Sequence, residues 1–217
     1  MAGTDELRLV AYFRDPAPMQ QLGVECPPLP EAFRSWVWGL GEWGKAALVT
    51  ASCAVSRAAL PAWETYVETD ERLGSVFGQP WVHQTLSAAE AWLANPDEER
   101  LSKARAALCV AQAVSEGVIL NVEEASGSAE VCSARERALA AALASLSAAK
   151  AAAWTPDDVI NGTLAGDRAE IEAKWKAGPA LEVVNSMGFA QEALLCSEQD
   201  LKSIIRAAFH SRLQAPQ

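Results

Sequence analysis

The fold is decided by the stretch Trp43–Trp92, which reads WGKAALVTASCAVSRAALPAWETYVETDERLGSVFGQPWVHQTLSAAEAW. It contains an alanine-rich segment, an acidic turn and a second segment with tryptophan near both ends. Six positions of the first segment recur at steps of three and four residues, the period of one face of an α-helix. These positions are Val49, Cys53, Ser56, Leu60, Trp63 and Val67. We therefore predict a helix that buries this face.

Small side chains form a neighbouring stripe on the same predicted helix, at Ala47, Ala51, Ala54 and Ala58. A stripe of methyl groups lets another helix approach closely, and large aromatic side chains fit against it. The second helix is predicted to begin at Gln79-Pro80, because proline suits the first helical position. Its inward positions are Trp81, Thr85, Ala88 and Trp92, with Leu86, Ala89 and Leu93 beside them. Burial of each tryptophan contributes about 2–3 kcal/mol.

Three further signals concern where helices start and stop before residue 155. Pro61 lies near the end of the first helix and predicts a kink or an early stop there. Asn95-Pro96 predicts the next start, with asparagine as the cap and proline in the first position. Ser126-Gly127-Ser128 predicts a break, followed by a broadly buried central helix over Ala129–Ala153.

The composition changes near Thr155 toward less alanine and shorter predicted helices. We expect a short helix after Thr155, a helix over Asp167–Lys176 closed by Gly178-Pro179, and a last helix opened by a capping box at Ser197–Asp200. The chain is therefore divided into residues 1–154, a helical domain with a proline-containing N-terminal segment 1–29, and residues 155–217. The second part is either a packed extension or a small subdomain.

These patterns together predict an all-α fold, a bundle of about six to eight helices with antiparallel neighbours. The β-branched residues are too few and too scattered for a large sheet. Residues 5–14 are the one ambiguous stretch, since they suit a short strand about as well as a helical turn.

Charge and composition restrict the possible partners. The 217-residue chain carries a formal net charge of −10, which argues against nucleic acid and anionic membranes as partners because both need a basic surface. The first residues lack the basic and apolar regions of a signal peptide, and Ala138–Trp154 is too alanine-rich to predict a membrane span. The five cysteines include no CxxC pair. We expect a protein of the reducing cytoplasm.

A glycine motif, Gly39-Leu40-Gly41-Glu42-Trp43-Gly44, matches the GxGxxG spacing of dinucleotide-binding loops, with Glu64 about twenty residues on. Glu42 would place a carboxylate where a pyrophosphate must sit, and Trp43 is bulky for such a loop. We favour the interpretation that these glycines end one helix and allow a tight turn into the next.

No catalytic pattern is found elsewhere. The two histidines, His83 and His210, lie far apart and each falls in a helical pattern. HExxH, GxSxG, P-loop, EF-hand and Glu-x-x-His motifs are all missing from the sequence. The sequence therefore predicts no enzyme, no metal site and no cofactor.

Two groups of charged residues are the candidate partner-binding positions. The first is the turn after the first helix, with Glu64, Glu68, Asp70, Glu71 and the single counter-charge Arg72. The second lies between Arg105 and Arg135, where no basic residue occurs, and consists of Glu116, Glu123, Glu124 and Glu130. Each group is either a solvated surface or a surface that attracts a basic partner.

The region Trp43–Ala153 resembles a family of immunity proteins from bacterial polymorphic toxin systems. The resemblance rests on the helix with Trp43, Ala47, Cys53-Ala54 and Leu60-Pro61, the turn Asp70-Glu71-Arg72, the ending Ala89–Leu93 and two alanine-rich helices. It covers about half of the chain. Leu73 stands where the family pattern has proline, and the later helices lack the family's histidines.

This resemblance implies a cytoplasmic protein that neutralises a toxin by binding it directly. Acidic residues would attract a basic toxin domain and apolar residues would hold it. Two other hypotheses stand beside this one. The chain is a structural or adaptor protein that self-assembles or bridges partners through alanine-rich faces, or it is an enzyme that binds a nucleotide at Gly39–Gly44.

Overall fold

The computed structural model describes residues 36–37, 39–69, 80–124, 129–154 and 168–214. In these ranges the chain is almost entirely helical, with no β-strand, so the predicted all-α bundle is confirmed. Residues 36–37 and 39–40 are helical and precede the elements with described bounds. The elements are η2 (Gly41–Trp43), α3 (Lys45–Thr69), α5 (Pro80–Ala94), α6 (Glu98–Glu124), α7 (Ala129–Ala153), α9 (Arg168–Leu194) and α10 (Glu198–Gln214).

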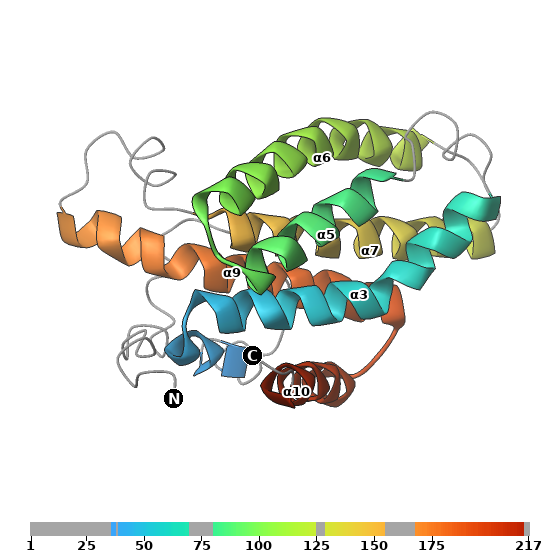
Figure 1. Cartoon of the computed structure of the whole chain (residues 1–217). Helices are drawn as coiled ribbons and strands as arrows, with labels where there is room; N and C mark the ends of the chain where they lie inside the picture. Colours follow the sequence, from blue (N-terminus) through green and yellow to red (C-terminus); the bar gives the residue numbers. More distant parts are fainter. Residues whose placement is uncertain (1–35, 38, 70–79, 125–128, 155–167, 215–217) are drawn as a thin grey trace.

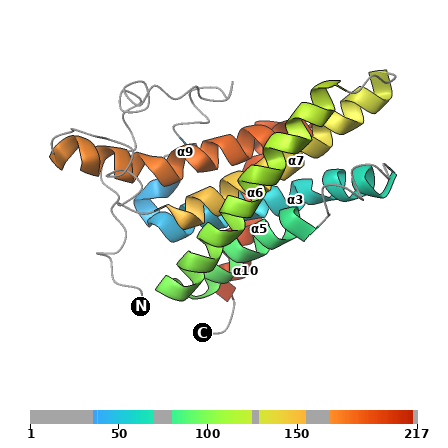
Figure 2. The same cartoon turned by 90° about the horizontal axis from the view of Figure 1, so that it is seen from above.

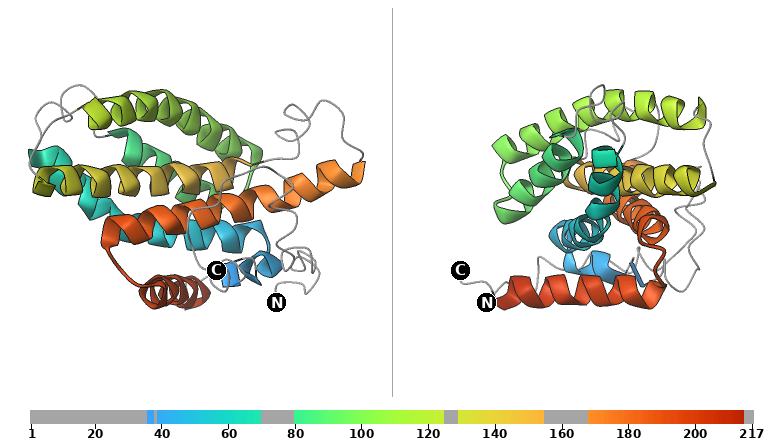
Figure 3. Two further views of the ribbon diagram at one scale, coloured as in Figure 1. Left: turned by 180° about the vertical axis from the view of Figure 1, so that it is seen from behind. Right: turned by 90° about the vertical axis from the view of Figure 1, so that its right-hand side faces the viewer.

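Helix α7 is the centre of the bundle, as its sequence predicted. It packs against α3, α9, α6 and α5, and α10 lies across the outer side of α3 (Figures 1 and 3). Nearly every residue from Ala138 to Ala153 is buried, and most of these residues are alanine. The methyl-sized side chains that make up most of this stretch allow four helices to approach α7 closely.

The predicted inner face of α3 is confirmed at all six positions, which are buried. In the small-residue stripe, Ala47 and Ala51 are buried, whereas Ala54 and Ala58 are partly exposed. Helix α5 begins at Pro80 as predicted and buries Trp81 and Trp92. The rings of Trp63 and Trp81 meet edge to face, with centroids 5.6 Å apart and planes at 71°, a favourable aromatic arrangement.

Two prolines lie inside helices. Helix α3 does not stop at Pro61 but continues to Thr69, and Figure 1 shows that it bends in its second half. Helix α9 likewise runs through Pro179, so the predicted helix end at Gly178-Pro179 is wrong. The residues that follow each proline, Trp63 in α3 and Val183 in α9, are buried in the core. The free energy gained by burying these side chains offsets the cost of the backbone hydrogen bond that each proline removes.

Helix α6 starts slightly later in the sequence than Asn95-Pro96, where its start was predicted. The helix begins at Glu98, and Asp97 caps it by accepting a hydrogen bond of 2.7 Å from the backbone N–H of Arg100. Asn95 lies outside the helix and donates its side-chain N–H to Asp97 at 3.0 Å. The backbone hydrogen bond from Arg100 lowers the pKa of Asp97 below its ordinary value, and desolvation opposes this only in part. The cap is therefore the aspartate.

The predicted capping box at the start of α10 is confirmed. Ser197 Oγ accepts from the backbone N–H of Asp200 at 3.3 Å, and Asp200 Oδ2 accepts from the backbone N–H of Ser197 at 2.9 Å. Leu201 and Ile205 of α10 then enter the same core that holds Val183 and Met187 of α9. The described parts of residues 155–217 thus pack directly on the core that α3 and α7 form. The predictions for residues 1–29, for 70–72 and for the helix start at 155–158 lie outside the described residues.

Cationic side chains define one end of the bundle. Lys45, at the start of α3, donates hydrogen bonds of 2.7 Å to the backbone carbonyls of Ala152 and Trp154. Arg105, near the start of α6, donates to the carbonyl of Ala153 at 3.4 Å. The start of α3, the start of α6 and the end of α7 therefore meet at this end. The positive charges lie at the negative end of the α7 dipole.

One stretch of the described helices, Lys45–Glu68 in α3, is long and apolar enough to span a membrane by length and composition. In this structure 67% of the relevant window is buried within the bundle. Core helices commonly have these same properties.

Candidate binding surface

The structure brings helix segments from both predicted groups of acids to the same end of the bundle (Figure 1). Glu64 and Glu68 lie in the last turns of α3, Glu123 and Glu124 end α6, and Glu130 begins α7. Figures 1 and 2 show the end of α3, the end of α6 and the start of α7 together, opposite the end that Lys45 and Arg105 hold. We call this the acidic end. Glu116 lies further back on α6, and Asp70, Glu71 and Arg72 lie outside the described residues.

The solvent-facing side of α3 leads into the acidic end. Its exposed positions are Arg57, Pro61, Thr65 and Glu68, which recur at helical spacing and form one ridge. Arg57 forms a two-pronged ion pair with Glu90 of α5. Exposed pairs of this kind contribute little to stability, but they neutralise both partners. The positive charge of Arg57 is therefore already compensated by Glu90 within the bundle.

The two acids that the structure describes at this end differ in their partners. Glu64 lies 3.3 Å from His83 Nε2 of α5, and both side chains are about two-fifths exposed. Glu68 is exposed and forms no ion pair within the described part of the chain. Glu68 is thus the carboxylate of this ridge that remains open to a partner.

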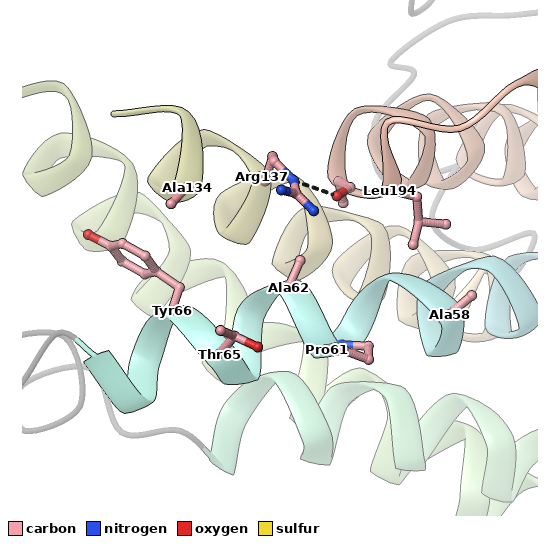
Figure 4. A pocket seen from close by; sticks show the side chains of 9 residues that line it. Ala58, Pro61, Ala62, Thr65, Tyr66, Ala134, Arg137 and Leu194 are labelled. Atoms are coloured by element: carbon pink, nitrogen blue, oxygen red, sulfur yellow. Dashed lines mark hydrogen bonds between the residues drawn. The ribbon is translucent and has the colours of Figure 1, made fainter. Parts of the chain in front are cut away.

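A groove of about 330 Å³ lies beside the ridge, between the second half of α3, the start of α7 and the end of α9 (Figure 4). Small side chains line most of it. The lining residues are Ala58, Pro61, Ala62, Thr65, Tyr66, Ala134, Arg137, Ala193 and Leu194. This groove was not predicted from the sequence. The signal was available in the alanines at 58 and 62, which mark an α3 surface too small to fill the space beside it.

Among the described lining residues of the groove, the charged side chain is the cationic Arg137. Arg137 Nε donates a hydrogen bond of 3.0 Å to the backbone carbonyl of Ala193, in the last turn of α9. A guanidinium suits this position because the last carbonyls of a helix have no partner within the helix. Arg135 Nε donates to the hydroxyl of Tyr66 at 2.5 Å and ties α7 to α3 at the wall of the groove.

The glycine motif forms a turn between helices, as the favoured interpretation predicted. Gly44 has φ of 87°, a conformation that suits glycine, and its N–H donates to the carbonyl of Gly41 at 3.0 Å. Trp43 is 65% exposed. No strand flanks this turn in the residues that the structure describes, so the motif has no strand–turn–helix context of the dinucleotide-binding kind.

Other reactive residue types are dispersed. Within the described ranges, no three His, Cys, Asp or Glu side chains are grouped so that they could hold a metal ion. Cys53 is buried in the core, and the described cysteines, which also include Cys109, Cys132 and Cys196, form no disulfide with one another. His210 lies exposed on α10, far along the chain from His83. What the described surface offers is the ridge that ends in the exposed Glu68, beside a small groove.

Comparison with known proteins adds no family to this description: no family model, no curated protein and no solved structure matches the chain.

Proposed function

We propose that this chain is a binding protein that uses its acidic end to hold a basic protein partner. The observation that carries the proposal is the convergence of α3, α6 and α7, which brings the segments with Glu64, Glu68, Glu123, Glu124 and Glu130 to one end of the bundle. Helix segments that lie far apart in the sequence thereby meet at one end of the bundle (Figure 1). A surface of one charge sign speeds encounter with a partner of the opposite sign.

The state of Glu68 supports this proposal. A carboxylate that already has an internal partner gains less from a new one, whereas Glu68 is exposed and forms no ion pair in the described part of the chain. The adjacent ridge positions Pro61 and Thr65 are uncharged and exposed, so neither of them repels a basic partner. The net charge of −10 also favours a basic partner, because the chain as a whole attracts positive charge.

In its narrower form, the proposal is that the partner is a bacterial toxin domain and that this chain is its immunity protein, resident in the cytoplasm. The resemblance over Trp43–Ala153 supports this form. Neutralisation would occur by masking the toxin surface, without any reaction catalysed by this chain.

The test uses the C-terminal domain of a large toxin encoded beside this chain. Both proteins are produced together and separately, cell growth is measured, and association is followed by surface plasmon resonance at 50 and 200 mM salt. We expect this chain to protect growth and the association rate constant to fall about tenfold with salt. No toxin gene, or no protection from it, would contradict the narrower form.

Charge variants test the surface itself. The double variant Glu64→Gln, Glu68→Gln should slow association several-fold, and further neutralisation of Glu123, Glu124 and Glu130 should slow it more. Glu99→Gln is the matched control, because Glu99 is an exposed acid at the start of α6, at the opposite end of the bundle. An association rate that depends equally on Glu99 and on the acidic end would refute the assignment.

A further inference from the structure

We propose a second binding site that is separate from the acidic end: the groove between α3, α7 and α9 accepts a short protein segment in which a bulky apolar side chain adjoins a carboxylate. The apolar side chain would fill the alanine-lined space, and the carboxylate would pair with Arg137. This assignment does not depend on the toxin or on the acidic residues.

The size and lining of the groove indicate an apolar side chain. Its volume of about 330 Å³ is at the lower end of the range for ligand sites, which suits one or two side chains better than a cofactor. Ala58, Ala62 and Ala134 form its walls together with Leu194. Contact between these methyl groups and a leucine, methionine or phenylalanine would remove apolar surface of both proteins from water.

Arg137 supplies the polar anchor. A guanidinium has five N–H donors, and the described structure assigns one of them, Nε, to the carbonyl of Ala193. Figure 4 shows the remaining nitrogens of Arg137 on the groove side, above Ala62. The bond to Ala193 already fixes the Arg137 side chain. A carboxylate could therefore pair with the guanidinium at little further cost in side-chain entropy of Arg137.

Charge complementarity excludes a basic segment from the groove. Among the described lining residues, Arg137 is the charged side chain, and its charge is positive. A lysine or arginine in the groove would lie against like charge and could not accept a hydrogen bond from Arg137. An isolated inorganic anion could pair with the guanidinium, but it would leave the alanine side chains of the groove exposed to water. The apolar and acidic requirements together point to a peptide segment.

The test is a selection of phage-displayed random twelve-residue peptides on the full-length chain. We expect the enriched peptides to share leucine, methionine or phenylalanine next to aspartate or glutamate. The best peptide is then synthesised, and its affinity is measured by fluorescence polarisation. Replacement of its acidic residue by the amide should weaken binding to the wild-type chain about tenfold, and weaken binding to the Arg137→Gln variant much less.

Filling the groove provides the second measurement. Ala134→Leu adds bulk at an exposed position that lines the groove, and should weaken peptide binding at least about tenfold. Ala106→Leu is the matched control, since Ala106 is an exposed alanine of α6 outside the groove. Circular dichroism and the unfolding midpoint establish that all variants fold.

Three outcomes would overturn the proposal: no enriched peptides, peptides without the apolar–acidic pair, or equal binding to the Ala134→Leu and Ala106→Leu variants. Enrichment of lysine- and arginine-rich peptides that bind the acidic end would support the proposed function while refuting the groove assignment. Loss of toxin binding in the Glu64→Gln, Glu68→Gln variant with unchanged peptide binding would separate the two sites.

Discussion

Lys45 donates a hydrogen bond of 2.7 Å from Nζ to the backbone carbonyl of Trp154, 109 residues further along the chain. The same ammonium bonds to the carbonyl of Ala152 and lies 4.3 Å from the ring centroid of Trp92. One side chain therefore joins the first turn of α3, the last turn of α7 and the face of α5. It supplies the end of α7 with donors that its own helix cannot provide.

Removal of this ammonium should destabilise the protein. Lys45→Met retains the apolar stem but deletes the charge, two hydrogen bonds and the contact with the Trp92 ring. We expect the free energy of unfolding to fall by about 2–3 kcal/mol, measured by urea denaturation at pH 7. Lys103→Met is the control, because Lys103 forms only an exposed pair with Glu99, and it should change stability little. Similar losses from the two variants would show that the Lys45 bonds contribute nothing beyond charge.

The contribution of the Trp63–Trp81 ring contact to stability should be measurable separately from the contribution of burying each side chain. Both indole Nε1 atoms are buried without a hydrogen-bond partner in the described structure. Trp63→Ala should therefore cost about 3–5 kcal/mol, whereas Trp63→Phe should cost much less because it removes an unsatisfied N–H and keeps a ring against Trp81. A double-mutant cycle with Trp81→Leu should give a coupling of about 0.5–1.5 kcal/mol for the ring pair. Full additivity of the two substitutions would contradict a specific contact.

Buried serines provide a matched pair of substitutions on α3. Ser56 Oγ donates to the carbonyl of Ala144 at 2.8 Å and lies 3.1 Å from Ser186 Oγ. Ser52 Oγ, one turn earlier, is buried without a partner in the described residues. Ser56→Ala should cost about 1 kcal/mol in urea denaturation, and Ser52→Ala should be neutral or stabilising. The reverse order would mean that the α3–α7–α9 interface does not depend on the Ser56 bond.

The fold followed from local patterns because those patterns report burial directly. The spacing of Val49, Cys53 and Trp63 gave the inner face of α3, and the alanine density of Ala129–Ala153 gave the central helix. The errors arose where tertiary packing overrides a local signal. Pro179 is such a case, since the buried turn that follows it keeps α9 continuous.

The candidate binding surface was harder to predict from the sequence than the fold. The acids were identified individually, but nothing in the sequence places the end of α3 beside the end of α6; that requires the packing of both helices around α7. The groove depends on Arg137 reaching the end of α9 from 56 residues earlier in the chain. Charge patterns are local, whereas sites formed by three helices are not.

The stability of this chain should respond to pH through Glu182 of α9. Burial raises the pKa of this carboxyl above its ordinary value of 4.5, although the nearby Lys150 charge and the Asn185 hydrogen bond act in the opposite direction. Its Oε2 atom is buried without a hydrogen-bond partner in the described part of the chain. The folded protein thus retains a proton at pH values where the unfolded chain has lost it. Its stability should decrease as pH rises from about 4.5 through the raised pKa.

Glu182→Gln removes this titration while keeping the shape of the side chain. Compared with the wild type, the variant should gain stability as the pH rises above about 4.5, and the difference should shrink below that pH, where the wild-type carboxyl is largely protonated in both states. Urea denaturation at several pH values measures the difference. Glu192→Gln, an exposed acid on the same helix, controls for the change in net charge. If Glu182→Gln were instead less stable at pH 8 than at pH 4 relative to the wild type, the attraction of Lys150 would outweigh burial, and Glu182 would be a stabilising ion-pair partner.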